Sequence, residues 1–395
     1  MDSTETKESR AARCDFDKSV ERCGTDSVKW SHYDEGVLPL WVADMDFPSP
    51  QPVIDALRER VAHGVFGYGM EPRDLRAVVQ ERLQSRYRWE VEPESMLFLP
   101  GVIVGFNLVS KAFGEAGDEV LIQTPVYPPF HAIGKNVERT IVSAPLVRAS
   151  GRYEVDFDLF ERTITPRTRV FLLCNPHNPV GRVYTHRELE RLAEICLRHK
   201  LIVCSDEIHQ DFVYEGYTHI PIASLSPEVA AHTVTLISPT KTFNIAGFHI
   251  SIAIASNPEV RDQLMATAAG VVPSRPGILD FVAANAAYRH GGAWLEQLVC
   301  YLQDNRDFLA RYLRERVPQL RMFAPQGTYL GWIDCRGAGI EGSPAEFFLR
   351  EARVALNDGA MFGEEGQGFV RLNFGCPRSV LEEALERMRA SLGRG

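Results

Sequence analysis

Short apolar runs alternate with longer amphipathic segments between about Gln51 and Trp294. This alternation is typical of a mostly parallel β-sheet whose strands are joined by helices on both faces. Strands covered on both faces are almost continuously apolar, so runs of Val, Ile, Leu, Ala and Cys mark the candidates. The pattern predicts strands at Val120 to Gln123, Val170 to Cys174, Leu201 to Ser205, Val234 to Ser238 and Ile250 to Ala255.

A segment with the periodicity of a helix lies between two of these runs. Between Arg187 and Arg198, apolar residues recur on one face of a helix, namely Leu189, Leu192, Ile195 and Cys196. This spacing predicts a crossover helix that packs against the sheet.

After Trp294 the pattern changes to a long amphipathic helix followed by short strands and a closing helix. The strands are predicted at Arg321 to Phe323, Tyr329 to Asp334 and Phe369 to Asn373, and the last helix at Ser379 to Leu392. We therefore expect an α/β fold with two parts. Residues 51–294 form a large domain around the mostly parallel sheet, and residues 1–50 and 295–395 form a smaller α+β domain with an N-terminal arm.

Composition and charge exclude several classes of protein. The 395 residues are 45% hydrophobic and 24% charged, as expected of a globular enzyme. The net charge of −9 comes without a basic block, which argues against nucleic acid as a partner. No apolar stretch reaches the roughly 18 residues needed to span a membrane. Met1 to Arg13 lack the apolar core of a secretory signal and are expected to form a solvated tail.

The cysteines and histidines indicate neither disulfides nor a metal site. The eight cysteines include no C-x-x-C pair, and Cys174 and Cys204 lie within apolar runs. Reduced thiols in a cytoplasmic protein are the natural interpretation. None of the eleven histidines belongs to an H-E-x-x-H or zinc-ligand pattern, so we expect no metal.

Three polar side chains follow separate predicted strands. Asn175, Asp206 and Lys241 come after the second, third and fourth runs, with separations that each leave room for a crossover helix. Each has an ordinary explanation when taken alone: a turn, a helix cap and a solvated lysine. Ligands of open parallel sheets bind beyond the carboxyl ends of the strands, so the three residues are predicted to meet there.

An amine, a carboxylate and an amide are what a pyridoxal phosphate site requires. The lysine holds the aldehyde as a Schiff base, the carboxylate keeps the ring nitrogen protonated, and the amide donates to the phenolate oxygen. Ser238 and Thr240 flank the lysine, and a Gly-containing turn opens a helix near Val102 and Ile103, where free backbone amides favour the phosphate. Tyr127 supplies an aromatic face for the ring.

Nearly the whole chain resembles the fold-type I pyridoxal phosphate enzymes of the aminotransferase kind. Within them it is most similar to the carbon-sulfur lyases of the cystathionine β-lyase and cystalysin branch. The motifs that carry the resemblance are Gly24 to Trp30, Pro39 to Phe47, Asp206 to Asp211, Lys241 to Gly247, Gly327 to Leu330 and Cys376 to Arg378.

The resemblance implies roles for individual residues. Lys241 is the Schiff-base lysine, Asp206 contacts the pyridine nitrogen, Asn175 lies near the phenolate oxygen and Tyr127 stacks on the ring. Arg371 binds the α-carboxylate of the substrate, for which a planar guanidinium is well suited. Further substrate contacts are expected from Ala43, Asp44, Asn175, Tyr127 and Tyr68.

Three positions have a special place in the comparison with aminotransferases. His209 stands where typical aminotransferases have a tyrosine, which is a mark of the lyase branch. His249 stands where they have a phosphate-binding arginine, so it either replaces part of that contact or simply begins a strand. Tyr68 resembles the family tyrosine that enters the neighbouring subunit's site, which implies a homodimer.

The expected reaction is an α,β-elimination on a cysteine S-conjugate or cystathionine, releasing a thiol, pyruvate and ammonia. Lys241, Asp206 and Tyr127 are the expected catalytic residues. Two alternatives keep the same cofactor: an aminotransferase, and a specialised biosynthetic enzyme that decarboxylates or oxidatively deaminates an S-cysteinyl intermediate. Some proteins of this branch also bind a transcription factor, so a binding role added to catalysis stays open. A dinucleotide-binding dehydrogenase is a poor fit, because no apolar strand precedes Gly64, Gly67 and Gly69.

Overall fold

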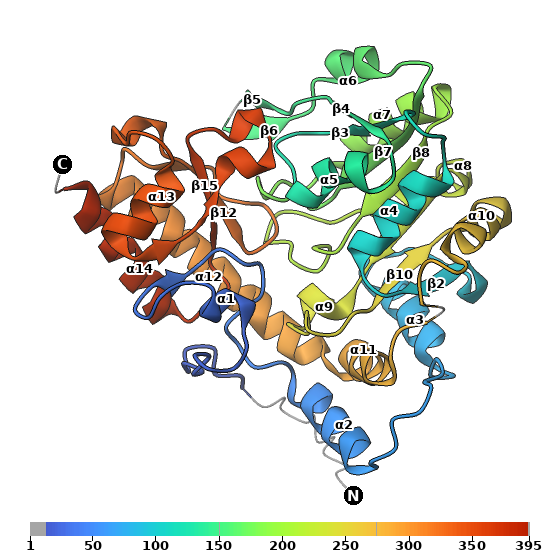
Figure 1. The fold of residues 1–395 in the computed structure, drawn as a ribbon, viewed down its shortest axis with the longest axis horizontal. Helices are drawn as coiled ribbons and strands as arrows, with labels where there is room; N and C mark the ends of the chain where they lie inside the picture. The colour runs from blue at the N-terminus through green and yellow to red at the C-terminus, as the bar shows by residue number, and fades with distance from the viewer. Residues whose placement is uncertain (1–12, 150, 274, 394–395) are drawn as a thin grey trace, which may run out of the picture.

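The fold is taken from a computed structural model that describes residues 13–149, 151–273 and 275–393. The expected N-terminal tail lies outside these residues, except for Arg13. The two larger β-sheets lie side by side, and helices surround both of them (Figure 1).

Seven strands form the larger sheet, in the order β2-β10-β9-β8-β7-β3-β4. The five strands from β4 to β9 in this order run parallel, whereas β10 is antiparallel to both β9 and β2. The sheet is therefore mixed but mostly parallel, as predicted. Its strands are β2 (Met96–Leu99), β3 (Glu119–Ile122), β4 (Thr140–Ser143), β7 (Thr168–Cys174), β8 (Ile202–Asp206), β9 (Thr233–Ile237) and β10 (Ser251–Ile254).

All five predicted strands are confirmed within two residues at each end. Alternate side chains of a strand point to opposite faces, and both faces of β7 are covered. Val170 and Leu172 belong to one core with α4 (Val102–Ala112) and α5 (Pro128–Asn136), whereas Phe171 and Leu173 belong to another with α7 (His186–Arg198). The predicted crossover helix is α7, and its apolar face is buried as expected.

Further helices pack near the β2 edge and connect the parts of the chain. They are α2 (Gln51–Ala62), α3 (Leu75–Tyr87), α10 (Pro258–Ala268) and α11 (Ile278–His290). Helix α11 packs against both α2 and α3. The shorter elements are α1 (Val28–Ser31), β5 (Val147–Ala149), β6 (Arg152–Glu154), α6 (Phe157–Thr163), α8 (Pro227–Ala231), α13 (Pro344–Phe347) and 3-10 or π-helical turns at 93–95, 222–224, 336–338, 348–352, 359–362 and 364–366.

The smaller sheet has the order β11-β12-β15-β14 and is antiparallel throughout. Its strands are β11 (Arg321–Met322), β12 (Leu330–Asp334), β14 (Asn357–Asp358) and β15 (Phe369–Asn373), and α14 (Arg378–Leu392) follows as the closing helix. The N-terminal arm joins this part, because β1 (Leu38–Pro39) pairs with β13 (Val354–Ala355). The three strands and the last helix predicted here are confirmed.

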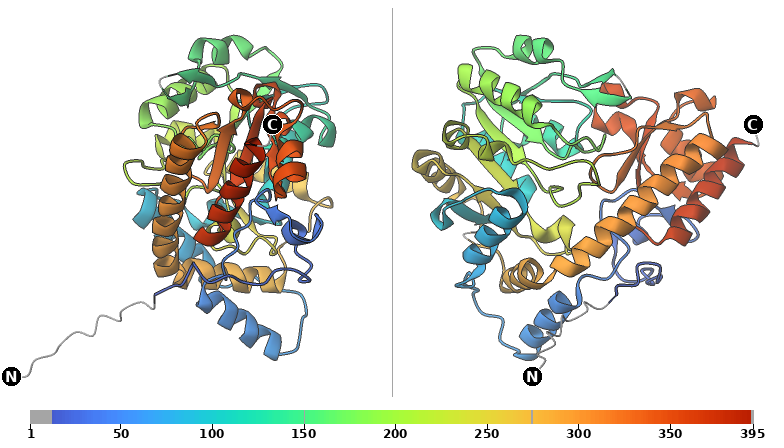
Figure 2. Two further views of the ribbon diagram at one scale, coloured as in Figure 1. Left: turned by 90° about the vertical axis from the view of Figure 1, so that its left-hand side faces the viewer. Right: turned by 180° about the vertical axis from the view of Figure 1, so that it is seen from behind.

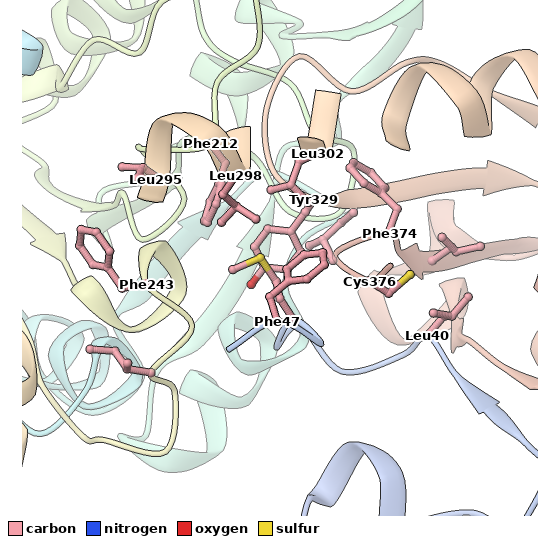
Figure 3. Packing of buried hydrophobic residues seen from close by; sticks show 14 of the residues in the cluster. Leu40, Phe47, Phe212, Phe243, Leu295, Leu298, Leu302, Tyr329, Phe374 and Cys376 are labelled. Carbon is pink, nitrogen blue, oxygen red and sulfur yellow. The ribbon is translucent and has the colours of Figure 1, made fainter. Parts of the chain in front are cut away.

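A long helix, α12 (Gly292–Arg316), connects the two parts and crosses the back of the molecule (Figure 2). Its buried leucines lie in one core with side chains of the arm and of the smaller sheet (Figure 3). Members of this core include Leu40, Phe47, Phe212, Phe243, Leu295, Leu298, Leu302, Tyr329, Phe374 and Cys376. The arm is therefore part of the core, and it brings residues 41–47 between the two sheets.

Within the described ranges, no helix is long and apolar enough to cross a bilayer. Among the same residues, no group of three or more His, Cys, Asp or Glu side chains gathers in a way that could hold a metal ion. Cys174, Cys196, Cys204, Cys335 and Cys376 are buried as thiols.

Candidate active site

The carboxyl ends of β7, β8 and β9 border one cavity of about 330 Å³. Parallel pairing brings the ends together, since Cys174 is in register with Asp206, and Asp206 with Leu236. The volume suits a small ligand. The wall consists of Ala43, Pro100, Gly101, Val102, Ile103, Val104, Phe106, Tyr127, Cys174, Asn178, Asp206, Ile208, His209, Thr240, Lys241, Ala246, Phe248, His249 and Ile250.

Lys241 lies on the single-turn helix α9 (Pro239–Thr242), directly after β9. Ser238 caps this turn, because its hydroxyl accepts a hydrogen bond from the Thr240 N–H at 3.1 Å. The amine of Lys241 donates to the carbonyl oxygen of Ala43 at 2.6 Å. Burial lowers the pKa of Lys241 to about 8, although the Asp44 carboxylate opposes this shift. A larger fraction of this amine is neutral, and so nucleophilic, than in a solvated lysine.

Asp206 is the last residue of β8 and is almost completely buried. Its Oδ1 accepts a hydrogen bond from the Ile208 N–H at 3.1 Å. Burial raises the pKa of Asp206 to about 7, and the charge of neighbouring Glu207 acts in the same direction. A carboxylate in such a place is stabilised by a cationic ligand group, which would restore its ionised form.

Tyr127 and His209 both border the cavity. Tyr127 precedes α5, and burial raises the pKa of its phenol. His209 is buried, and its Nδ1 has no hydrogen-bond partner among the described residues. Burial, together with the charges of Lys241 and Arg371, lowers the pKa of His209 to about 3. The imidazole is therefore neutral and has a free ring nitrogen for a polar ligand atom.

The amide side chain in the cavity wall is Asn178, whereas the sequence indicated Asn175. The Asn175 side chain is completely buried, donates to the Ile220 carbonyl and accepts from the Tyr184 N–H, both at 3.4 Å. Both asparagines belong to the same Asn-Pro-rich turn, and the turn geometry directs the second one into the cavity. Asn175 is thus a support of the turn behind the wall.

Arg371 lies on β15 of the smaller sheet and is buried next to the cavity. Its Nη1 donates to Asn178 Oδ1 at 3.0 Å, and its Nη2 donates to the Trp41 carbonyl at 2.9 Å and to Asn357 Oδ1 at 2.6 Å. The Nε has no partner in the described part of the chain. Burial lowers the pKa of Arg371 to about 10, so the guanidinium remains a cation that neutral groups surround.

The start of α4 also borders the cavity. Val102 and Ile103 are its first residues, and Gly101 adopts a φ of +119° that favours glycine. The free amides of a helix N-terminus attract an anion. Thr240 also borders this space, whereas Ser238 lies behind it and bonds to the Thr240 hydroxyl and the Ile250 carbonyl, both at 2.7 Å.

The remaining predicted site residues lie in different surroundings. His249 is exposed at the cavity wall, and its backbone N–H donates to Asp280 Oδ1 at 3.1 Å. Tyr68 is fully exposed and does not border this cavity. Ala43 lies in the wall, while Asp44 is outside it and forms a 2.8 Å ion pair with Arg22.

Tyr329 also contributes to the site, although no role was predicted for it from its motif, Gly327 to Leu330. This completely buried phenol donates a hydrogen bond to the Ala43 carbonyl at 2.8 Å, the same oxygen that Lys241 contacts. The sequence offers no signal for this contact, because it depends on where the N-terminal arm lies in the fold.

The residues present fit pyridoxal phosphate. Lys241 supplies an amine with a lowered pKa, Asp206 a buried carboxyl group, Tyr127 an aromatic ring and α4 an anion site. The free nitrogen of His209 and the amide of Asn178 remain for the polar substituents of a ring. These groups line one cavity, as a cofactor with an aldehyde, a ring nitrogen and a phosphate requires.

Comparisons with known proteins agree with a pyridoxal phosphate site. Residues 35–388 match the family model "Aminotransferase class I and II". Cystathionine β-lyase PatB of Bacillus subtilis is 40% identical over 391 residues, covering 95% of this chain and 99% of PatB. Among solved structures, OvoB is 45% identical with a TM-score of 0.93, covering 97% of this chain and all of OvoB.

Cystalysin from Treponema denticola, solved with a pyridoxal 5'-phosphate cofactor, has the same fold. It is 31% identical, with a TM-score of 0.93, and the match covers 97% of this chain and 100% of cystalysin. The similarity thus extends over both sheets and includes the elements that border the cavity.

Proposed function

The chain belongs to the class I and II aminotransferase family, in its pyridoxal phosphate-dependent carbon–sulfur lyase branch, and we propose that the cavity around Lys241 is its active site. The reaction is an α,β-elimination that cleaves the bond between Cβ and sulfur. We propose L-cysteine S-conjugates, cystathionine included, as the substrates, and a thiol, pyruvate and ammonia as the products. The observation that carries the proposal is a lysine of lowered pKa in one cavity with Asp206, beside Arg371.

The bound cofactor supplies a ring that accepts electrons and so stabilises negative charge at the substrate Cα. Lys241 holds the aldehyde group, Asp206 holds the ring nitrogen in its protonated form, and Tyr127 packs on the ring. The start of α4 at Val102 and Ile103, together with Thr240, would hold the phosphate, and Ser238 orients the Thr240 hydroxyl. We assign the contact to the phenolate oxygen to Asn178 instead of Asn175, with His209 beside it.

The substrate carboxylate binds to Arg371. Its guanidinium donates to neutral oxygens of Asn178, Trp41 and Asn357 and lies over the Phe362 ring. No carboxylate of the described residues pairs with it, so a substrate carboxylate would be its anionic partner. With a substrate in the site, the neutral amine of Lys241 would remove the Cα proton.

A direct assay tests the proposal. Purified protein with pyridoxal phosphate is given cystathionine and S-alkyl cysteines, and thiol and pyruvate are measured together. Equal amounts of both are expected. Transfer of the amino group to 2-oxoglutarate, or release of carbon dioxide, without thiol formation would contradict elimination and support one of the alternatives.

We propose that the active unit is a homodimer in which Tyr68 reaches the partner's cavity. Val65, Phe66, Tyr68 and Met70 form an exposed stretch, and Met70 also borders a separate, largely apolar cavity of about 650 Å³ beside β2. Apolar stretches of this kind are typical of interfaces.

Mixing an inactive Lys241→Ala protein with an inactive Tyr68→Ala protein tests the shared site. Activity should return, because one of the two sites in a mixed dimer has both residues. If subunits exchange and activity does not return, the proposal of a shared site is contradicted.

The buried thiols, such as Cys174 and Cys204, support a reducing compartment, and we propose the cytoplasm. We also propose that residues 51–294 form one domain and that residues 1–50 and 295–395 form the other; the pairing of β1 with β13 supports this division.

A further inference from the structure

Residues 41–47 form a segment without helix or strand, called the strap here, that runs between the two sheets. Side chains from distant parts of the chain donate hydrogen bonds to its backbone carbonyls. Every carbonyl from Trp41 to Met45, and that of Phe47, has such a donor. The donors are Arg371 for Trp41, Asn373 for Val42, Lys241 and Tyr329 for Ala43, Lys29 and Asn373 for Asp44, Arg22 and Asn244 for Met45, and Asn244 for Phe47.

Two asparagines hold opposite halves of the strap. The amide nitrogen of Asn373 donates to the carbonyls of Val42 and Asp44 at 2.6 and 2.7 Å. That of Asn244 donates to Met45 and Phe47 at 2.9 and 2.7 Å, and its Oδ1 accepts from the Met45 N–H at 2.9 Å.

Each asparagine lies close in sequence to a cation of the site. Asn244 follows Lys241 in the turn after α9, where its φ of +52° is left-handed, and Asn373 follows Arg371 by two residues on β15. Lys241 and Arg371 themselves contact the strap, at Ala43 and Trp41. One segment thus connects the lysine of the larger sheet to the arginine of the smaller sheet.

These two cations have other partners when the site is filled. Lys241 then holds the cofactor and Arg371 the substrate carboxylate, so their bonds to Ala43 and Trp41 compete with the ligands. The two asparagines lie outside the cavity wall, and their bonds to the strap face no such competition.

We propose that Asn244 and Asn373 are positioning residues that keep the strap closed over the substrate and fix the spacing of Lys241 and Arg371 during turnover. This inference rests on the proposed function. It assigns neither asparagine a direct contact with the reacting atoms.

Asn305 offers a matched control for Asn373. Both are completely buried, and both donate from the amide nitrogen to two backbone carbonyls: Asn305 to Phe374 and Cys376 at 3.0 and 2.8 Å. Each also accepts one hydrogen bond, Asn373 from the Gly375 N–H and Asn305 from Arg378 Nε, both at 2.8 Å. Of the two, Asn373 alone donates to the strap, whereas Asn305 reaches it only indirectly, through the Gly375 carbonyl that accepts from the Asp46 N–H at 2.9 Å. Asn373→Leu and Asn305→Leu therefore remove similar bonds with direct and indirect consequences for the strap.

Hydrogen–deuterium exchange of the holoenzyme, read in peptides that cover 41–47, tests the inference without relying on turnover. Asn373→Leu should speed exchange in the strap about 10-fold or more, as expected for the loss of two buried hydrogen bonds, whereas Asn305→Leu should have a clearly smaller effect. Asn244→Gly keeps the left-handed backbone while removing the amide, and it should also speed exchange. Equal strap protection in all three variants would overturn the proposal.

Kinetics then separate positioning from general loss of stability. Asn373→Leu should raise KM for the amino-acid substrate about 10-fold, because it disturbs the carboxylate site, and Asn244→Gly should mainly lower kcat, because it disturbs the lysine. The Asn305→Leu control should change neither. A uniform effect of all three variants contradicts positioning. If no variant or wild type cleaves a thioether, the proposed function fails while the exchange result still decides the role of the strap.

Discussion

The carboxylate of Asp211 accepts a hydrogen bond from the hydroxyl of Thr242, the residue that follows Lys241, at 2.8 Å. The other oxygen of the same carboxylate accepts from Arg82 at 2.6 Å and from Tyr87 at 2.7 Å, both on α3. Burial raises the pKa of Asp211, but the nearby arginines outweigh it and hold the pKa at about 2. This ionised group therefore anchors the lysine turn to a helix outside the sheet.

Replacing Thr242 by valine should lower kcat about 10-fold, because it frees the turn that presents Lys241 while preserving side-chain shape. The loss of one buried hydrogen bond should also reduce the free energy of unfolding by about 1 kcal/mol. Thr235→Val is the matched control, since the buried Thr235 hydroxyl has no partner among the described residues. Steady-state kinetics and urea unfolding measure both effects; equal kcat values for the two variants would show that the Asp211 anchor is irrelevant to catalysis.

Lys241→Ala should abolish both turnover and the visible absorbance of the bound cofactor, because no other amine lies in the described wall of the cavity. Lys135→Ala, an exposed lysine on α5, should retain both. Borohydride reduction of wild-type protein followed by mass spectrometry should find the reduced cofactor on the peptide that contains Lys241. A label on a different peptide would remove the basis of the active-site assignment.

Without cofactor, Asp206 should make stability fall as the pH rises. Its pKa is about 7 in the folded protein and 3.8 ordinarily, so between these values the folded state binds the additional proton. The free energy of unfolding therefore decreases over this interval, and the loss is complete above about pH 7. Asp206→Asn lacks this titration and should be more stable than wild type at pH 8, but not at pH 3. Urea unfolding of both apoproteins checks this; a less stable variant at pH 8 would argue against a raised pKa.

Asn178→Ala and Asn175→Ala should have different effects, because only Asn178 borders the cavity. The first should shift the absorbance of the bound cofactor and lower kcat/KM about 10-fold, as the loss of one polar contact in the site predicts. The second should mainly lower the midpoint of thermal unfolding. Spectra, kinetics and melting curves of both proteins compare them directly. The reverse pattern would indicate that Asn175, and not Asn178, contacts the cofactor.

Arg371→Lys should raise KM and lower kcat/KM roughly 100-fold, since an ammonium cannot form two parallel hydrogen bonds with a carboxylate. Arg350→Lys, at an exposed arginine, is the control and should behave as wild type. Substrates with an amide in place of the α-carboxylate should have a low kcat/KM with the wild type. The Arg371→Lys substitution should lower that kcat/KM only slightly further. An undiminished preference for the carboxylate in this variant would place the anion site elsewhere.

The strands that carry the site could be predicted because both of their faces are buried. Strand β7 is apolar at every position from Val170 to Cys174, and the polar residues that follow it stand out. Strand β4 could not be found in this way, since it is partly exposed and its Thr140 and Ser143 ends are polar. The antiparallel direction of β10 could not be predicted from the apolar pattern. A strand covered on both faces has the same apolar composition whichever way it runs.

The site was predictable where chemistry alone identifies a residue. Lys241 and Asp206 were found from residue type and position after a strand. The choice between Asn175 and Asn178 depends on the shape of one turn, which the sequence does not specify. The role of Ala43 could be inferred only from family resemblance, because its contact with Tyr329 joins residues far apart in the chain.

The strap has a consequence for how the protein is made. Its partners include Lys29, which is synthesised before the strap, and Asn373, which is synthesised long after it. The strap therefore emerges from the ribosome well before all of its hydrogen-bond partners exist. A chain that stops before β15 lacks both Arg371 and the Asn373 amide that holds Val42 and Asp44. Synthesis through β15 is therefore needed before the strap has all of these bonds and before the arginine proposed to bind the substrate carboxylate is present.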